Sequence, residues 1–167
     1  MRLLAIGLIV FLFSCKVCEK KKTEEVKMKT EVLEKASIIE FSEVKSGENS
    51  DYKTAQNIIF TTQQEMDLAW GKMFAAYDRK PPIPMVDFET KQLLLITMGE
   101  QPSGGYTTKV KTMTSTAKGI VVTIEDAKPG KTCNTTSALI YPFQLVEMPK
   151  TEEAISFVRV SKINECK

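Results

Sequence analysis

Residues 92–98 read Gln-Leu-Leu-Leu-Ile-Thr-Met, a nearly continuous apolar run that decides the fold. A run of this kind suits a central β-strand that is covered on both faces. The segments after it alternate polar and apolar residues or are rich in β-branched residues, so they also predict strands. These segments are 106–113, 119–125, 138–148 and 155–160. We expect the first two to form a hairpin. In the third, Pro142 indicates a bend or an edge position.

The segment before the apolar run adds a helix. Short strands are predicted at 38–44 and 58–60, after which Thr62 and Glu65 form a capping box that begins a helix. Prolines end this helix before residue 80. Its apolar residues recur at three- and four-residue spacing on one face, where we interpret Trp70 as a core anchor. They are Met66, Ala69, Trp70, Met73, Phe74 and Tyr77. The predicted class is α+β, with one early amphipathic helix packed on a mainly antiparallel, strongly bent β-sheet or sandwich.

The N-terminal residues predict a lipoprotein signal. Arg2 precedes an apolar stretch, 3–13, that is too short to cross a hydrocarbon core as a helix. The stretch ends in Leu-Phe-Ser-Cys at 12–15, which resembles the lipobox of bacterial lipoproteins. We therefore predict a signal peptide over 1–14 and a lipid such as palmitate on Cys15, which holds the chain on a membrane. The alternatives are an uncleaved membrane anchor and a signal removed by the ordinary signal peptidase.

The residues after Cys15 predict a tether and then a single domain. Residues 15–36 are dominated by Lys and Glu with few large apolar side chains, which is typical of a solvated spacer. The globular domain is expected over 37–167. The tether does not begin with an acidic run, so we favour a lipid-anchored position in the bacterial cell envelope that faces the periplasm rather than the cell surface.

The composition excludes several classes of function. The chain has 167 residues, with 23 Lys and Arg against 21 Asp and Glu, and it lacks the basic excess that nucleic-acid binding needs. It contains no histidine, which removes Ser-His and Cys-His dyads and histidine-ligated zinc. We predict no enzymatic activity, no catalytic residue, no metal, no cofactor and no small-molecule substrate.

Two short motifs that suggest chemistry are rejected. Residues 129–132, Pro-Gly-Lys-Thr, resemble the end of a phosphate-binding loop, but Glu125 stands where the upstream glycine is required, so we interpret them as a hairpin loop. Glu125 and Asp126 are adjacent and would point to opposite faces of a strand, so they cannot act together on one substrate bond.

The chain has four cysteines, and in an exported protein each is expected to be modified, paired or free for a reason. Cys15 is assigned to the lipid, and Cys133 and Cys166 are the pair within the predicted domain. We expect a disulfide between these two; the alternative is two free thiols. Cys18 is left over, either free or paired with another protein.

The loop after the apolar run is the candidate site. It reads Gln101-Pro102-Ser103-Gly104-Gly105-Tyr106. Proline restricts φ, and two glycines allow positive φ and the close approach of another backbone. One interpretation is a partner-binding loop that displays Tyr106. The other is a structural turn in which Tyr106 belongs to the core.

Several of these motifs, in this order, resemble the PrcB C-terminal domain family. They are Met-Gly-Glu at 98–100, Pro-Ser-Gly-Gly-Tyr at 102–106, and Tyr-Pro-Phe-Gln-Leu-Val at 141–146, within a resemblance over 93–150. The resemblance implies a small β-rich domain, frequent on bacterial lipoproteins, and an accessory or stabilising subunit of a surface or periplasmic protease complex. It implies no catalytic residue.

The same loop also resembles a loop of chagasin-type cysteine-protease inhibitors, which is the alternative function. Those inhibitors use two further loops, with Gly-x-Gly and Arg-Pro-Trp, and neither pattern is present here. The sequence therefore predicts a lipid-anchored cell-envelope module that binds a protein partner.

Overall fold

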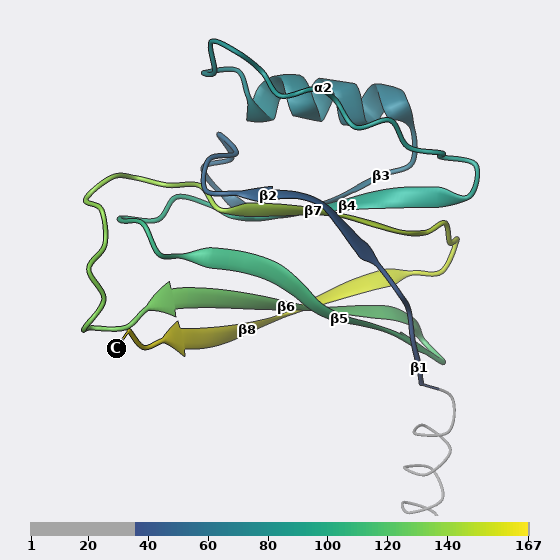
Figure 1. Cartoon of the computed structure of the whole chain (residues 1–167). Helices are drawn as coiled ribbons and strands as arrows, with labels where there is room; N and C mark the ends of the chain where they lie inside the picture. The colour runs from purple at the N-terminus through teal and green to yellow at the C-terminus, as the bar shows by residue number, and fades with distance from the viewer. Residues whose placement is uncertain (1–35, 167) are drawn as a thin grey trace, which may run out of the picture. The chain divides into compact units, whose positions relative to one another are not determined.

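The computed structural model describes residues 36–166 and, within them, has one helix and eight strands. Two four-stranded sheets lie face to face, and the helix covers the other face of one of them (Figure 1). This arrangement confirms the α+β class and its sandwich form. The elements are β1 (Ser37–Ile38), β2 (Ser42–Gly47), β3 (Ala55–Phe60), α2 (Gln63–Met73), β4 (Lys91–Met98), β5 (Thr107–Thr116), β6 (Gly119–Pro129), β7 (Phe143–Pro149) and β8 (Ile155–Asn164).

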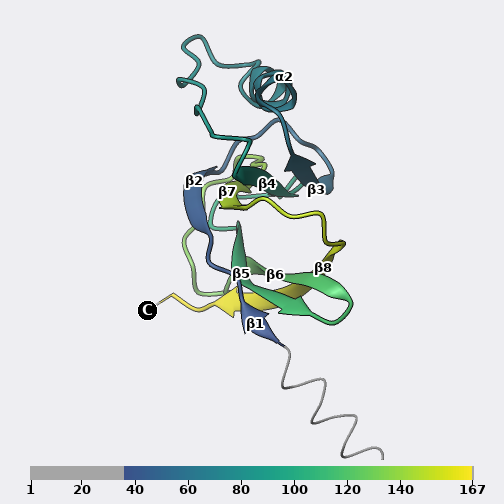
Figure 2. The ribbon, with the colours of Figure 1, turned by 90° about the vertical axis from the view of Figure 1, so that its right-hand side faces the viewer.

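We name the two sheets by their place in the layers. The central sheet has the order β2-β7-β4-β3, and the outer sheet has the order β1-β5-β6-β8. All neighbouring strands are antiparallel except β6 and β8, which are parallel. Figure 2 shows the three layers from the end: α2, the central sheet and the outer sheet. The central sheet is thus covered on both faces, which explains why β4 is buried from Gln92 to Thr97.

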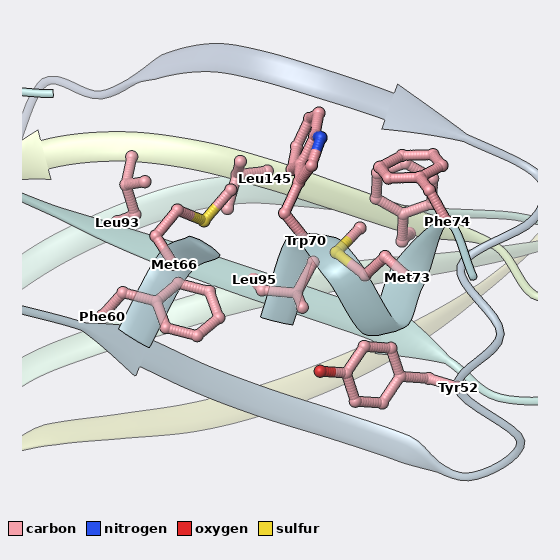
Figure 3. Close-up of a cluster of buried hydrophobic side chains, with 10 residues drawn as sticks. Tyr52, Phe60, Met66, Trp70, Met73, Phe74, Leu93, Leu95 and Leu145 are labelled. Atoms are coloured by element: carbon pink, nitrogen blue, oxygen red, sulfur yellow. The ribbon is translucent and has the colours of Figure 1, made fainter. Parts of the chain in front are cut away.

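The first core lies between α2 and the central sheet. The capping box is present, since Thr62 accepts from the Glu65 amide and Glu65 accepts from the Thr62 amide. Trp70 is 1% exposed, and its Nε1 donates to the carbonyl oxygen of Pro81 at 3.0 Å, so it is the core anchor that its spacing predicts. Figure 3 shows the side chains of the helix close to those of the sheet and its neighbours; the labelled ones are Tyr52, Phe60, Met66, Trp70, Met73, Phe74, Leu93, Leu95 and Leu145.

The second core lies between the two sheets. Alternate residues of β4 and β7 point away from α2 and meet the inner face of the outer sheet. The largest contributors are buried aliphatic and methionine side chains: Leu94, Ile96, Met113, Ile120, Val122, Ile124, Val146 and Met148.

Polar side chains also join the two sheets. Arg159 of β8 donates two hydrogen bonds to Asp126 of β6, at 3.0 and 2.9 Å, and reaches across to the central sheet. There it donates to Asn57 Oδ1 at 2.7 Å and to the Thr97 carbonyl oxygen at 2.9 Å. The oxygen of Gln144, on β7, accepts from the Val110 amide of β5 at 2.7 Å. These contacts hold the sheets in one relative position because a buried donor or acceptor is costly to leave unpaired.

Some details of the predicted elements are wrong. The helix is not early, because three strands precede it, and it ends at Met73 rather than including Tyr77. Phe74 caps it, with a φ of −117° that leaves the helical range. Residues 38–44 are not one strand: β1 pairs with β5 of the outer sheet and β2 with β7 of the central sheet. Ile39 and Phe41, between them, pack into the second core, which explains their apolar character.

Two further corrections concern the connection between β6 and β7. Residues 129–132 are not a hairpin loop, because β6 and β7 lie in different sheets and 130–142 crosses between them. Pro142 does not mark an edge strand: it stands just before β7, which lies between β2 and β4. The predicted hairpin of β5 and β6 is confirmed, with Thr116 opposite Gly119 at its turn.

Candidate functional site

The loop over 101–106 joins β4 to β5 and lies against the β6–β7 connection. Gln101 pairs with Ile140 through two backbone hydrogen bonds, of 2.8 and 3.1 Å. The Gly104 amide donates to the Thr136 carbonyl oxygen at 3.1 Å. The loop is therefore held along most of its length by another segment of its own chain.

The two glycines are needed for this close approach. A Cβ on Gly104 would stand 2.6 Å from Oγ1 of Thr136, and one on Gly105 would stand 3.2 Å from Cβ of Pro129. Gly105 also has a φ of +88°, which disfavours any other residue. The segment whose close approach the two glycines allow is therefore residues 129–136 of the same chain. Pro102 and Gly105 remain exposed.

Tyr106 lies between the two roles considered from the sequence, because it is half-buried. It lines a hollow of about 310 Å³ together with Gly47 at the end of β2 and Phe143 at the start of β7. Its ring is therefore partly packed and partly available at the surface.

Tyr141, from the second family-like motif, lies on the β6–β7 connection, beside the segment that follows β2. It bridges to Asn49, and its hydroxyl donates to Oε2 of Glu100 at 3.0 Å. This hydrogen bond to a carboxylate, with burial and nearby negative charge, raises the pKa of the Tyr141 phenol. The two motifs, distant in sequence, thus meet beside the same short segment, 46–49.

Two more hollows adjoin this segment. One, of about 400 Å³, is lined by Phe74, Tyr77 and the prolines after the helix; the other, of about 330 Å³, lies between Tyr77 and Tyr141. Lys45, Arg79 and Lys80 line the first, and within residues 36–166 none of the three forms an ion pair. We call the surface formed by segment 46–49 and by Tyr77, Tyr106 and Tyr141 the tyrosine surface.

Sequence reasoning found part of the tyrosine surface and missed the rest. It singled out 101–106, but it placed Tyr77 on the apolar face of the helix. In the structure Tyr77 follows the helix and is 42% exposed, with its ring edge-on to Phe74. The prolines at 81, 82 and 84 limit the helix only to residues before 80, so they did not indicate that it ends at Met73 and leaves Tyr77 outside.

The paired carboxylates do not form a catalytic site. Asp126 points inward to Arg159 and Thr108, whereas Glu125 points to the outer face among Lys109, Lys111 and Lys162. Burial raises the pKa of Glu125, but the three ammonium groups outweigh burial and hold that pKa below its ordinary value. Both carboxylates are therefore neutralised by structural partners.

Cys133 and Cys166 are joined by a disulfide, with their Cα atoms 5.0 Å apart. It ties the β6–β7 connection to the residues after β8, as the cysteine count predicts. The predicted lipid site, Cys15, and Cys18 lie outside the described residues.

The described residues contain neither a metal-ligand cluster nor a membrane-spanning helix. Over 36–166 no group of three or more cysteine or acidic side chains is placed to hold a metal ion. No helix in the same range is long and apolar enough to cross a membrane.

Comparisons with known proteins add one positive finding. No curated protein and no solved structure matches the chain. Residues 93–149, from β4 to the end of β7, match the model of the PrcB C-terminal family, which confirms the resemblance carried by the loop over 101–106 and by the Tyr-Pro-Phe motif.

Proposed function

We propose that the protein is a lipid-anchored protein-binding module of the bacterial cell envelope, and an accessory or stabilising subunit of a protease complex. Its anchor is the lipid on Cys15, and the tether over 15–36 carries the domain on the side that faces the periplasm. The module performs no chemistry itself: it binds its partner through the tyrosine surface.

The observation that carries this proposal is the meeting of the two PrcB-like motifs on one surface. Tyr106 and Tyr141 are 35 positions apart in the matched segment, yet both lie beside residues 46–49. The hollow of about 400 Å³ shares lining residues with each of the other two, so a single protein partner can occupy more than one of them. Tyrosines that are half-buried offer a large, rigid contact at low entropic cost, and they are enriched in protein interfaces.

The charges on this surface favour a protein partner with acidic groups. Lys45, Arg79 and Lys80 line the hollow of about 400 Å³ beside segment 46–49, and Glu48 is the acidic residue in the same lining. The nearby Glu100 accepts from Tyr141. A carboxylate of the partner would find unpaired cations there, which supports recognition and steers association.

The test is affinity capture of the full chain from solubilised membranes, with the co-purifying proteins identified. Tyr106→Ala should reduce capture of a protease or a protease-complex subunit at least about tenfold, since truncating a central aromatic contact costs 2 kcal/mol or more. The matched control is Leu68→Ala, which truncates an apolar side chain that is 71% exposed on α2, away from the tyrosine surface.

A thermal melt of each variant separates binding from folding. We expect Tyr106→Ala to keep most of its melting temperature, because its ring is half-buried rather than in either core. The proposal is wrong if no protease component is captured, if Leu68→Ala loses it equally, or if Tyr106→Ala loses it only by unfolding.

A further inference from the structure

β8 is an open edge of unusual length. It has ten residues and lies at the margin of the outer sheet, with β6 as its one strand neighbour in the described chain (Figure 2). The other three edges of the two sheets are shorter or irregular: β1 has two residues, β2 has an irregular register between Glu43 and Lys45, and β3 has six residues. A long, regular edge strand presents a row of unpaired backbone groups, which is a template for another strand.

The pairing with β6 shows which backbone groups of β8 face the open edge. The Ile120 amide donates to the Ala154 carbonyl oxygen, and the Gly130 amide donates to the Asn164 carbonyl oxygen, both at 2.8 Å. Even-numbered residues of β8 therefore point their backbone groups toward β6. Odd-numbered residues, from Phe157 to Ile163, point theirs toward the open edge, because the direction alternates along a strand.

The side chains of β8 give the edge little protection, because its one exposed charge, Lys162, is paired with Glu125 at 3.5 Å. Val158, Val160 and Ile163 are 47%, 36% and 53% exposed. An inward charge often discourages edge pairing, but Arg159 is already neutralised by its two hydrogen bonds to Asp126. The edge is thus regular, partly apolar and free of an uncompensated inward charge.

We propose that two copies of this chain pair through β8, antiparallel, about a two-fold axis at Val160. The two outer sheets then join into one eight-stranded sheet. Val160 faces Val160 of the second copy, Phe157 faces Ile163, and Arg159 faces Ser161. The pairing goes beyond the proposed function, since it uses a different surface and needs no protease.

A second copy fits this edge because β8 is complementary to itself in this register. No two like charges stand opposite each other, and the exposed Ile163 is covered by Phe157 of the second copy. An axis at Arg159 would instead place two arginines opposite each other, which is unfavourable. An axis at Val158 would place Ile163 opposite Glu153 and expose it again.

Cysteine crosslinking of the full chain in bacterial membranes, with Cys18 replaced by Ser, tests the proposed register. Val160 would form a non-hydrogen-bonded pair with its copy, with Cα atoms about 4.5 Å apart, which is within disulfide range. Val160→Cys should therefore shift to twice the monomer mass on a non-reducing gel. The matched control is Val158→Cys, on the same face, whose two copies would lie about 13 Å apart and should remain monomeric.

A second pair of variants tests the dimer without crosslinking. Val160→Lys places two ammonium groups opposite each other at the axis and should shift the chain to monomer in detergent, as measured by analytical ultracentrifugation. Ile38→Lys adds the same charge at an 80% exposed site on the opposite edge of the outer sheet and should leave the dimer intact. We expect Val160→Lys to leave capture of the protease unchanged, so failure of the dimer can be distinguished from failure of the proposed function.

Three results overturn the pairing. They are no crosslink at Val160→Cys, a crosslink at Val158→Cys instead, or a sedimentation coefficient of the unmodified chain that corresponds to a monomer at all concentrations tested.

Discussion

Replacing Arg159 by Met should remove the main polar tie between the two sheets. The guanidinium makes four hydrogen bonds of 2.7 to 3.0 Å, two to Asp126, one to Asn57 and one to the Thr97 carbonyl oxygen. Methionine keeps much of the apolar stem, so the loss is mainly electrostatic. Asp126 would keep the hydroxyl of Thr108 as a hydrogen-bond partner but lose its cation.

The magnitude follows from burial. Breaking a fully buried ion pair costs 3 to 5 kcal/mol, whereas an exposed pair is worth about 0 to 1 kcal/mol. The side chains of Arg159 and Asp126 are 26% and 16% exposed, which places the pair nearer the buried limit but with some solvent screening. We expect Arg159→Met to lower the free energy of unfolding by about 3 kcal/mol.

Urea denaturation followed by tryptophan fluorescence measures this loss, because Trp70 is buried in the first core. With a slope of about 1.5 to 2 kcal/mol per molar urea, the midpoint should fall by about 1.5 to 2 M. Lys162→Met is the matched control on the same strand: the Lys162 side chain is 52% exposed and its ammonium lies 3.5 Å from Glu125, so this variant should lose much less stability. Equal losses in the two variants, or a loss below about 0.5 kcal/mol for Arg159→Met, would refute the reasoning.

Three further predictions concern the anchor, the disulfide and the acid stability. Cys15→Ser should abolish incorporation of labelled palmitate and release the chain from the membrane fraction; equal labelling would contradict the lipid anchor. Reducing the Cys133–Cys166 disulfide, which spans 33 residues, should cost about 3.5 kcal/mol of stability in urea, and titratable thiols at both positions before reduction would contradict it. Because the folded pKa of Glu125 lies below its ordinary value of 4.5, its stabilising effect is complete above that pH and is lost as the pH falls through the folded pKa. Glu125→Gln should therefore flatten the stability curve below pH 4.5, and an unchanged acid slope would exclude this role.

Local patterns in the sequence predicted much of the fold. The nearly continuous apolar run at 92–98 predicted a central strand, because apolar residues on both faces indicate that both faces are covered. The capping box and the buried Trp70 were also recognisable, since they depend on residues a few positions apart. The position of each sheet was not recognisable. Ile39 and Phe41 have the same apolar character whether they continue a strand or cross between two sheets.

The candidate site was predictable only in part for the same reason. Two glycines and an aromatic residue singled out the loop over 101–106, but its contact partner, 135–136, is a polar stretch without a pattern. Arg159 appears in sequence as an ordinary charged residue in an alternating strand. Its role emerges only when the parallel pairing of β8 with β6 places it beside Asp126. Contacts of this kind depend on topology, which a local pattern does not contain.

The disulfide has a consequence for the order of maturation. Cys166 follows β8, which pairs with β6. Between β6 and β8 the chain forms β7 in the other sheet, so β8 can dock only after the chain returns to the outer sheet. The two thiols come together when that last, non-local strand has docked, which is the slowest kind of contact to form in a β-rich chain. The Cys133–Cys166 disulfide therefore forms only after β8 has docked, and its presence indicates a completely folded domain. In an oxidising compartment, a chain that has not yet docked β8 would still carry two free thiols at these positions.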